Sequence, residues 1–261
     1  MTSPRIPFRF SKDIQPVADF TISIALGQVP GWTHYRKFGM NDDVDSGIEY
    51  VWPPGTERIL PTAATVVAVV SDSAEDDPDE ATPPGTGGWT VTLQGLDANY
   101  DQIEETVTLA GLTPANTTQE FLRVHRAFVV TAGSTEANVG NISMSIGGDL
   151  QAYIEAVEGQ THQLLYTIPR NHTLAINNIN TVAGRLANTD VQVILQYKPF
   201  GTDTAWRSVS DLAPYESQMV TPGFFDVFEE KGEIRMRIDS TATNTQVGAE
   251  VHGFLIDNDY L

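Results

Sequence analysis

The side chains best suited to bind a cation are those of Asp97, Asn99 and Asp101, which alternate along the chain. Such spacing begins a calcium loop of the EF-hand type, which continues with glycine at its sixth position and glutamate at its twelfth. This chain has Gln102 and Thr108 at those two positions. The pattern therefore predicts a turn in which Asp and Asn side chains bond the backbone, and not a metal site.

The histidines are dispersed and do not suggest a metal or catalytic centre. None of them forms the HExxH spacing of a zinc site, and they stand at His34, His125, His162, His172 and His252. The GxSxG, GxGxxG and phosphate-binding P-loop patterns are also missing from the sequence. His125 adjoins Val124 and Arg126 on a predicted strand, so we interpret it as a hydrogen-bonded sheet histidine and not as a base.

Carboxylates are abundant, but no pair is set apart by an apolar or aromatic frame that would distinguish an acid from a base. Glu104 and Glu105 are adjacent on a predicted strand, which favours a strand edge. The segment 71–88, SDSAEDDPDEATPPGTGG, predicts a long polar loop that projects into solvent. Its run Glu75–Glu80 could collect divalent cations loosely, but a solvated loop is the favoured interpretation. We therefore predict that the protein is not an enzyme and has no catalytic residue, metal site or cofactor.

Composition limits the classes of partner. The chain has 261 residues, a formal net charge of −19 and a pI of about 4.4. Nucleic acids and anionic membranes are polyanions that select Lys and Arg, so neither is an expected partner. The sequence has no cysteine, which excludes disulfides and thiol chemistry. We expect no signal peptide in the first residues, and the longest apolar runs, such as 63–70, are too short to span a bilayer.

The elements that would position any site are strands. The segment Gly88 to Leu109 has two alternating runs joined by Gly, Asp and Asn, which predicts an antiparallel hairpin. Similar alternating runs recur along the chain, separated by turn residues, and no helical period persists. The predicted fold class is all-β, with two tandem antiparallel β-sandwich or jelly-roll-like domains and an extended N-terminal arm.

The predicted boundary lies at Gly147-Gly148, after which the strands begin again. The arm would comprise residues 1–19, the first domain residues 20–147 and the second residues 148–261. Residues on one face of the predicted strands supply the expected cores. These are Leu122, Val124, Phe128 and Val130 in the first domain, and Val191, Val193 and Leu195 in the second.

Two segments near the start of the first domain have a pattern of their own. Residues Phe20 to Leu26 alternate apolar and small polar side chains, which predicts a first strand. Residues Gly31 to Gly39, GWTHYRKFG, mix aromatic and basic side chains. Such a mixture can form a nucleic-acid stacking surface, but on so acidic a chain we expect an aromatic loop that packs under a sheet.

The N-terminal arm is the predicted partner-binding element. Its prolines disfavour a sheet interior and keep the segment extended, and its side chains are basic on an otherwise acidic chain. The residues expected to contact a partner are Arg5, Ile6, Phe8, Arg9, Phe10 and Lys12. An extended segment of this kind can add to a sheet edge or lie along a groove of a neighbouring subunit. Folding back on the chain's own first domain is the alternative.

The central segments GGWTVTLQGLDANYDQIEETVTLAG and TTQEFLRVHRAFVVTAGSTEANVGNISM resemble uncharacterised virion structural proteins of tailed bacteriophages, many from marine hosts. KFGMNDDVDSGIEYVWPPG precedes them in the same order. The resemblance is close over residues 36–146 and looser in the C-terminal half. The chain departs from the pattern in the loop from Glu75 to Pro84 and in the start of the hairpin at Trp89.

The resemblance implies a virion structural protein made in the host cytoplasm, either a capsid decoration or cement protein or a neck- or tail-associated one. Its expected partners are major capsid, neck or tail subunits and further copies of itself, without nucleic acid or membrane. It carries over no catalytic residue. A receptor- or glycan-binding module of the particle remains the alternative, since β-sandwiches commonly carry sugar sites on aromatic platforms.

Overall fold

The computed structural model describes residues 20–79, 84–184, 190–201, 205–214, 217–220, 226–241 and 243–261. These residues form an almost entirely β structure of four antiparallel sheets, so the all-β prediction is confirmed. A six-residue helix, α1 (Phe20–Ala25), precedes the strands, and a short 3-10 helix, η1 (Asn258–Tyr260), follows them. No helix in the described part of the chain is long and apolar enough to cross a membrane.

Two of the sheets enclose the larger core and form what we call the flanking module. The strands of the first sheet lie in the order β1 (Trp32–Val44), β17 (Thr245–Asp257), β11 (His172–Ala183) and β14 (Ser217–Val220), with β15 (Asp226–Phe228) also on β11. Those of the second lie in the order β10 (Leu165–Thr167), β16 (Glu233–Ser240), β12 (Val191–Lys198) and β13 (Arg207–Leu212), with β2 (Gly47–Tyr50) on β16.

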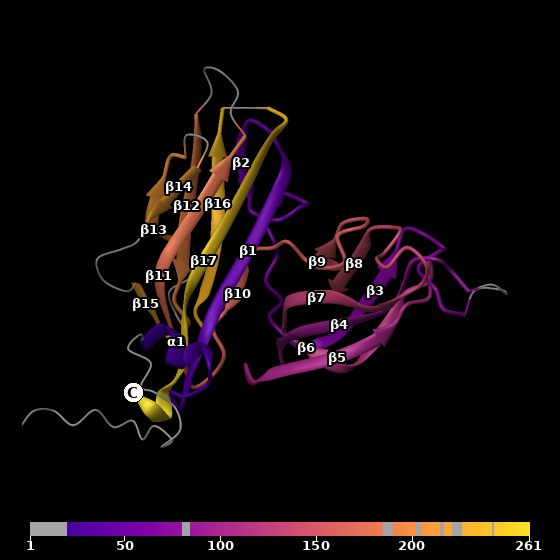
Figure 1. The fold of residues 1–261 in the computed structure, drawn as a ribbon, viewed down its shortest axis with the longest axis horizontal. Helices are drawn as coiled ribbons and strands as arrows, with labels where there is room; N and C mark the ends of the chain where they lie inside the picture. The colour runs from indigo at the N-terminus through magenta and orange to yellow at the C-terminus, as the bar shows by residue number, and fades with distance from the viewer. Residues whose placement is uncertain are drawn as a thin grey trace, which may run out of the picture.

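The other two sheets enclose a second core and form the inserted module, which lies to one side of the flanking module (Figure 1). One sheet has the order β6 (Ala115–Phe121), β3 (Thr65–Ser71), β8 (Ile142–Ile146) and β9 (Asp149–Ile154). The other has the order β5 (Gln102–Thr108), β4 (Gly88–Leu96) and β7 (Arg123–Ala132).

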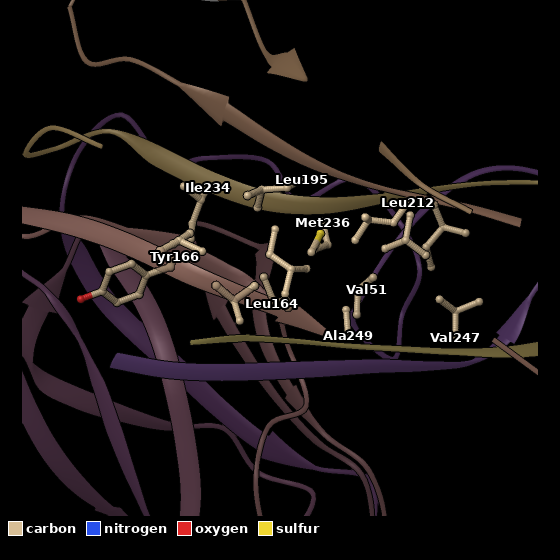
Figure 2. Close-up of a cluster of buried hydrophobic side chains, with 14 of the residues drawn as sticks. Val51, Leu164, Tyr166, Leu195, Leu212, Ile234, Met236, Val247 and Ala249 are labelled. Carbon is tan, nitrogen blue, oxygen red and sulfur yellow. The ribbon is translucent and has the colours of Figure 1, made fainter. Parts of the chain in front are cut away.

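Each module has its own apolar core. The flanking core is built from β-branched and aliphatic residues that point inward from both of its sheets, as Figure 2 shows for Leu164, Leu195, Met236 and Val247 among others. The inserted core is formed by a separate cluster that includes Val67, Leu93, Phe121, Ile142 and Ile154. The two largest clusters are separate, which indicates two packing units, each of which removes its own apolar surface from water.

The division of the chain between these units differs from the predicted one. Strand β1 pairs with β17 from Trp32↔Ile256 to Val44↔Thr245, and β2 pairs with β16. The early strands therefore belong to the flanking module, and the segment from Thr65 to Ile154 is inserted between them and the later strands. The strand pairing thus corrects the boundary at residue 147, and the jelly-roll description stays a prediction.

Gly147 and Gly148 form a hairpin turn within the inserted module. They connect β8 to β9, where Ile146 pairs with Asp149, and both have positive φ (60° and 95°). A two-residue hairpin loop of this type requires positive φ at both positions, which glycine adopts without a Cβ penalty. The two glycines do form a turn, as their sequence indicates. In the sequence alone, however, a tight turn between paired strands looks the same as a boundary between domains.

Two predictions near residue 20 were wrong. Residues Phe20–Ala25 form helix α1 and not a strand, because one turn of helix buries Ile24 against Phe254 and Ile256 of the flanking module. The segment expected to be an aromatic loop is the first part of β1. The predicted arm, residues 1–19, lies outside the described residues.

The predicted core residues are only partly correct. Leu122, Val124, Val191, Val193 and Leu195 are buried, as expected. Phe128 is only partly buried and Val130 is 52% exposed, so these two predictions were wrong. The pairing of β7 with β4 is interrupted by register shifts, and each extra residue at a bulge moves the following side chains to the other face. Ala127 and Val129 contact the core instead.

The central hairpin and its turn are confirmed. β4 pairs with β5 from Thr90↔Thr108 to Leu96↔Gln102. In the turn, the Asp97 carboxylate accepts hydrogen bonds from the backbone N–H groups of Asn99 (2.8 Å) and Asp101 (2.9 Å). The Asp and Asn side chains thus stabilise a local turn, as their spacing predicted.

The acidic loop is not simply solvated. Asp76 is fully buried, and its carboxylate accepts four hydrogen bonds, from Ser71 Oγ (2.6 Å) and from the N–H groups of Gly88 (2.6 Å), Val139 (2.8 Å) and Gly140 (2.9 Å). It therefore joins the loop to two distant strand ends, which corrects the prediction for this part of the segment. Glu75 and Asp79 are exposed, as expected.

Candidate binding cleft between the modules

A polar cleft of about 540 Å³ lies between the edge of β1 and the β5-β4-β7 sheet of the inserted module. Its volume falls within the range of about 300–1,000 Å³ found for ligand sites. The lining residues come from both modules. They are His34, Tyr35, Arg36, Lys37, Phe38, Gln94, Gly95, Gln102, Ile103, Glu104, His125, Arg126, Thr161, Gln163 and Tyr166.

Strand β1 is placed by its pairing with β17 and by one close approach. Alternation turns Tyr35 toward the flanking core, where its ring lies 5.0 Å from that of Tyr166. At Gly39, a Cβ atom would come within 2.5 Å of the Val51 carbonyl oxygen and 2.6 Å of the Leu164 nitrogen. Glycine at this position lets the segment that follows the insertion run directly alongside β1.

At the floor of the cleft, three side chains donate hydrogen bonds to two backbone carbonyl groups of β7. Gln163 Nε2 donates to the carbonyl oxygens of Val124 and His125, each at 3.1 Å, and Lys37 Nζ donates to that of His125 at 2.6 Å. Arg58 Nη1 also donates to the Val124 carbonyl at 3.1 Å. Buried carbonyl groups of β7 are thereby satisfied by side chains of β1, of the linker between β2 and β3 (residues 51–64) and of the segment between β9 and β10.

His125 is a buried, hydrogen-bonded histidine. Its Nε2 accepts a bond from the Thr167 backbone N–H at 3.2 Å, and its ring packs 4.4 Å from that of Tyr166. Burial, together with the nearby charges of Lys37, Arg58 and Arg123, holds the pKa of His125 well below its ordinary value. The imidazole is therefore neutral at pH 7, in agreement with its interpretation as a sheet histidine.

Positive charge is concentrated at the cleft of an otherwise acidic chain. Arg36 pairs with Glu250, and Arg126 donates to Gln160 Oε1 at 3.1 Å. Lys37 has no carboxylate within ion-pair distance among the described residues. Burial, and then the charges of Arg58 and Arg126, lower the pKa of Lys37 to about 7. Lys37 is thus a cation poorly compensated by the protein itself.

A buried ion pair fixes the two walls of the cleft relative to each other. Arg123 of β7 donates from Nε to Glu233 Oε1 of β16 at 2.9 Å, and its Nη2 lies 2.8 Å from the same oxygen. The other Glu233 oxygen accepts from Thr167 Oγ1, and Arg123 Nη1 donates to the Pro61 carbonyl at 2.7 Å. Both charged side chains are at most 7% exposed. This arrangement cross-links the inserted module, the linker and the flanking module.

The residues predicted from the sequence to bind a partner are not those of the cleft. Arg5, Ile6, Phe8, Arg9, Phe10 and Lys12 lie outside the described residues. Lys37, Arg126 and Tyr166 were not predicted as site residues, because strand pairing brings them together from distant parts of the chain. The mixture of basic and aromatic side chains in residues 31–39 was the available signal. Among the described residues, no group of three or more His, Asp or Glu side chains could hold a metal ion.

The uncompensated charge of Lys37 predicts a pH-dependent effect on stability. Because the pKa of Lys37 is lower in the folded than in the unfolded chain, the unfolded state binds the proton more tightly, and Lys37 destabilises the fold most at low pH. We expect Lys37→Met to be more stable than wild type at pH 7, with an advantage that shrinks by about 2 kcal/mol toward pH 9. Urea unfolding of both proteins across this range measures the difference. An advantage independent of pH would contradict the lowered pKa.

No protein-family model matches the sequence, and no curated protein matches it. Among solved structures, a structure of the infectious bursal disease virus Gx strain shares 9% identity, with a TM-score of 0.25 over 95% of this chain and 79% of that one. The crystal structure of the infectious bursal disease virus VP2 subviral particle shares 12% identity, with a TM-score of 0.24 over 87% of this chain and 72% of that one. TM-scores this low do not establish a shared fold.

Proposed function

We propose that this chain is a structural component of a tailed-phage virion, a capsid decoration or cement protein or a neck- or tail-associated one, which acts through protein–protein contacts. It has no catalytic activity and no cofactor. It is made in the host cytoplasm and assembles with further copies of itself and with capsid, neck or tail subunits. The sequence resemblance over residues 36–146 supports this proposal.

The structural observation that supports the proposal is that buried polar contacts join the flanking module to the inserted module. The buried pair Arg123–Glu233 and the carbonyl contacts of Arg58 and Gln163 tie the two modules together across their boundary. A unit whose two modules are held together by buried polar contacts can present fixed surfaces to its neighbours in a particle. The long edge strand β1 supplies a surface on which another chain can add.

The N-terminal arm is the proposed assembly element. We expect deletion of residues 1–12 to leave a folded protein that no longer incorporates into particles, because the deleted residues include the basic side chains Arg5, Arg9 and Lys12 and the apolar Ile6, Phe8 and Phe10. Particles purified from infected cells that express the tagged chain would be assayed for the tag by quantitative immunoblot.

Matched substitutions separate charge from apolar contact. One variant replaces Arg5, Arg9 and Lys12 by Gln, and the other replaces Ile6, Phe8 and Phe10 by Ser. Circular dichroism of each purified variant shows whether it folds. If the deletion variant incorporates at the wild-type level, the arm is not the assembly element. If the wild-type chain itself is missing from purified particles, the proposed function is wrong.

The alternative, a receptor- or glycan-binding module, predicts an exposed aromatic platform flanked by polar groups. Tyr100 and Phe200 do meet at the surface, with the Lys231 ammonium 5.7 and 5.2 Å from their ring centroids. Their rings are edge to face at 74°, whereas a sugar ring stacks on a flat aromatic face. This surface therefore does not favour the glycan alternative, which a glycan array with the purified chain would test.

A further inference from the structure

The edge of β1 that faces away from β17 carries backbone groups in position to accept another strand. Met40 N–H donates to the His162 carbonyl at 3.2 Å and so points away from β17. Alternate residues of an antiparallel strand point their N–H and C=O groups to the same side. His34, Arg36 and Phe38 therefore present theirs to this outer edge, and no described residue bonds them.

The cleft lies along this edge and is open. All residues from His34 to Phe38 line it, with the β5-β4-β7 sheet opposite. Its lining contains more polar than apolar groups, unlike a site for an apolar small molecule. A groove of this kind along an unpaired strand edge suits an extended peptide, whose backbone bonds the edge and whose side chains lie alternately toward each wall.

The charges of the cleft select an acidic occupant. Among the described residues, Lys37 has no carboxylate partner, and the Arg126 guanidinium donates to the neutral amide of Gln160. Glu104 is the carboxylate in the lining, and its Oε2 accepts from Gln94 Nε2 at 2.6 Å. A carboxylate placed beside Lys37 would gain a charge-assisted hydrogen bond and relieve the repulsion among the cations.

We propose that an extended, carboxylate-bearing segment of another protein subunit adds to the free edge of β1 in this cleft. Its backbone pairs with the N–H and C=O groups of Arg36 and Phe38, and a carboxylate binds Lys37 and Arg126. The inference rests on the proposed function, because it names the chemistry of a partner in an assembly. The chain's own N-terminal arm does not fit, since its charged residues are mainly Arg5, Arg9 and Lys12.

The proposed binding is linked to protons. Lys37 is faced by Tyr35 from its own strand, His125 and Arg126 from β7, Tyr166 from β10 and Arg58 from the linker. The tyrosines have raised pKa values and the pKa of His125 is well below its ordinary value, so all three are neutral at pH 7. Only Lys37 among them changes charge around neutral pH, with its pKa at about 7. Binding that requires its ammonium therefore weakens by roughly tenfold from pH 6 to pH 8.

The test uses the full chain and a fluorescein-labelled octapeptide of alternating Glu and Val, with binding followed by fluorescence anisotropy at pH 6. Three other compounds test separately the sign of the charge, the backbone pairing and the binding of a carboxylate alone. They are the same peptide with Lys in place of Glu, the peptide N-methylated at alternate amides, and free glutarate as an unlabelled competitor. Lys37→Met removes the proposed cation, and Lys198→Met, on β12 and outside the cleft lining, is the matched control.

We expect saturable binding of the Glu-Val peptide, which Lys37→Met weakens by at least roughly tenfold and Lys198→Met by less than about twofold. The Lys peptide and the N-methylated peptide should not bind. Equal binding of the N-methylated peptide, or competition by glutarate as effective as that of unlabelled peptide, would overturn strand addition. No binding, or equal loss in both lysine variants, would overturn the site. Incorporation of the wild-type chain into particles is measured separately, so either failure leaves the proposed function to its own test.

Discussion

Replacing Asp76 by Ala is expected to destabilise the protein by at least about 3 kcal/mol, because it leaves buried donors without an acceptor. The Asp76 carboxylate is inaccessible to solvent and accepts from one hydroxyl and three backbone N–H groups. Water cannot replace it without a rearrangement of the loop. Urea unfolding followed by circular dichroism measures the loss.

Asp76→Asn keeps the shape of the side chain but leaves it with one acceptor oxygen in place of two. It therefore tests whether both carboxylate oxygens are needed. An amide keeps one acceptor oxygen but turns an NH₂ group toward donors, such as Ser71 Oγ and the Gly140 N–H that bond one carboxylate oxygen. We expect this variant to lose nearly as much stability as Asp76→Ala. Hydrogen exchange of the Gly88, Val139 and Gly140 amides should accelerate in both variants.

Asp79→Ala is the matched control, since Asp79 is an exposed carboxylate of the same loop. It should change the free energy of unfolding by no more than about 0.5 kcal/mol. If Asp76→Ala is as mild as Asp79→Ala, the Asp76 carboxylate does not hold the loop to the strand ends, and the acidic segment is only a solvated loop.

The second large effect is expected at the ion pair between the modules. Arg123→Met should destabilise the protein by about 3–5 kcal/mol, because it leaves the Glu233 carboxylate buried without its cation. Glu233→Gln should also be costly, since Arg123 then loses its counter-charge. The double variant should cost less than the sum of the single variants, which a double-mutant cycle measures as a coupling energy.

Arg170→Met is the control for a charge pair that also joins the modules. Arg170 lies 2.9 Å from Asp101 across the same boundary, but the two side chains are 52% and 43% exposed. A solvated pair of this kind contributes about 0–1 kcal/mol. If Arg123→Met lowers the free energy of unfolding no more than Arg170→Met does, the buried pair Arg123–Glu233 does not stabilise the contact between the modules more than an exposed pair.

Local features of this protein were predictable from the sequence alone. The alternation in residues 88–109 and the Asp-Asn-Asp turn predicted the β4–β5 hairpin, because both strands and their connection lie within a short segment. Val191, Val193 and Leu195 were likewise predicted as core residues, and β12 pairs with β16 over its whole length without a register shift. An uninterrupted ladder keeps alternate side chains on one face. Charge and composition do not depend on the fold at all.

Pairing over long sequence distances was decided only by the tertiary structure. Alternation predicts that a strand has one buried face, but it does not specify which strand lies beside it. Nothing local indicated that β1 pairs with β17, or that Gly147-Gly148 turns within an insertion. The bulges in β7 likewise place Val130 at the surface. Asp76 is buried and accepts hydrogen bonds because backbone N–H groups near distant strand ends surround it.

The cleft depends on the same long-range pairing. Lys37, His125 and Tyr166 are far apart in the sequence, and each has an ordinary local pattern. They meet because the insertion places β7 across the cleft from β1, and because Gly39 allows residues 162–164 to approach the edge of β1. The basic and aromatic composition of residues 31–39 was visible in the sequence. The unpaired backbone edge of β1 and the missing counter-charge of Lys37 could not be predicted from it, because both depend on how the two modules pack.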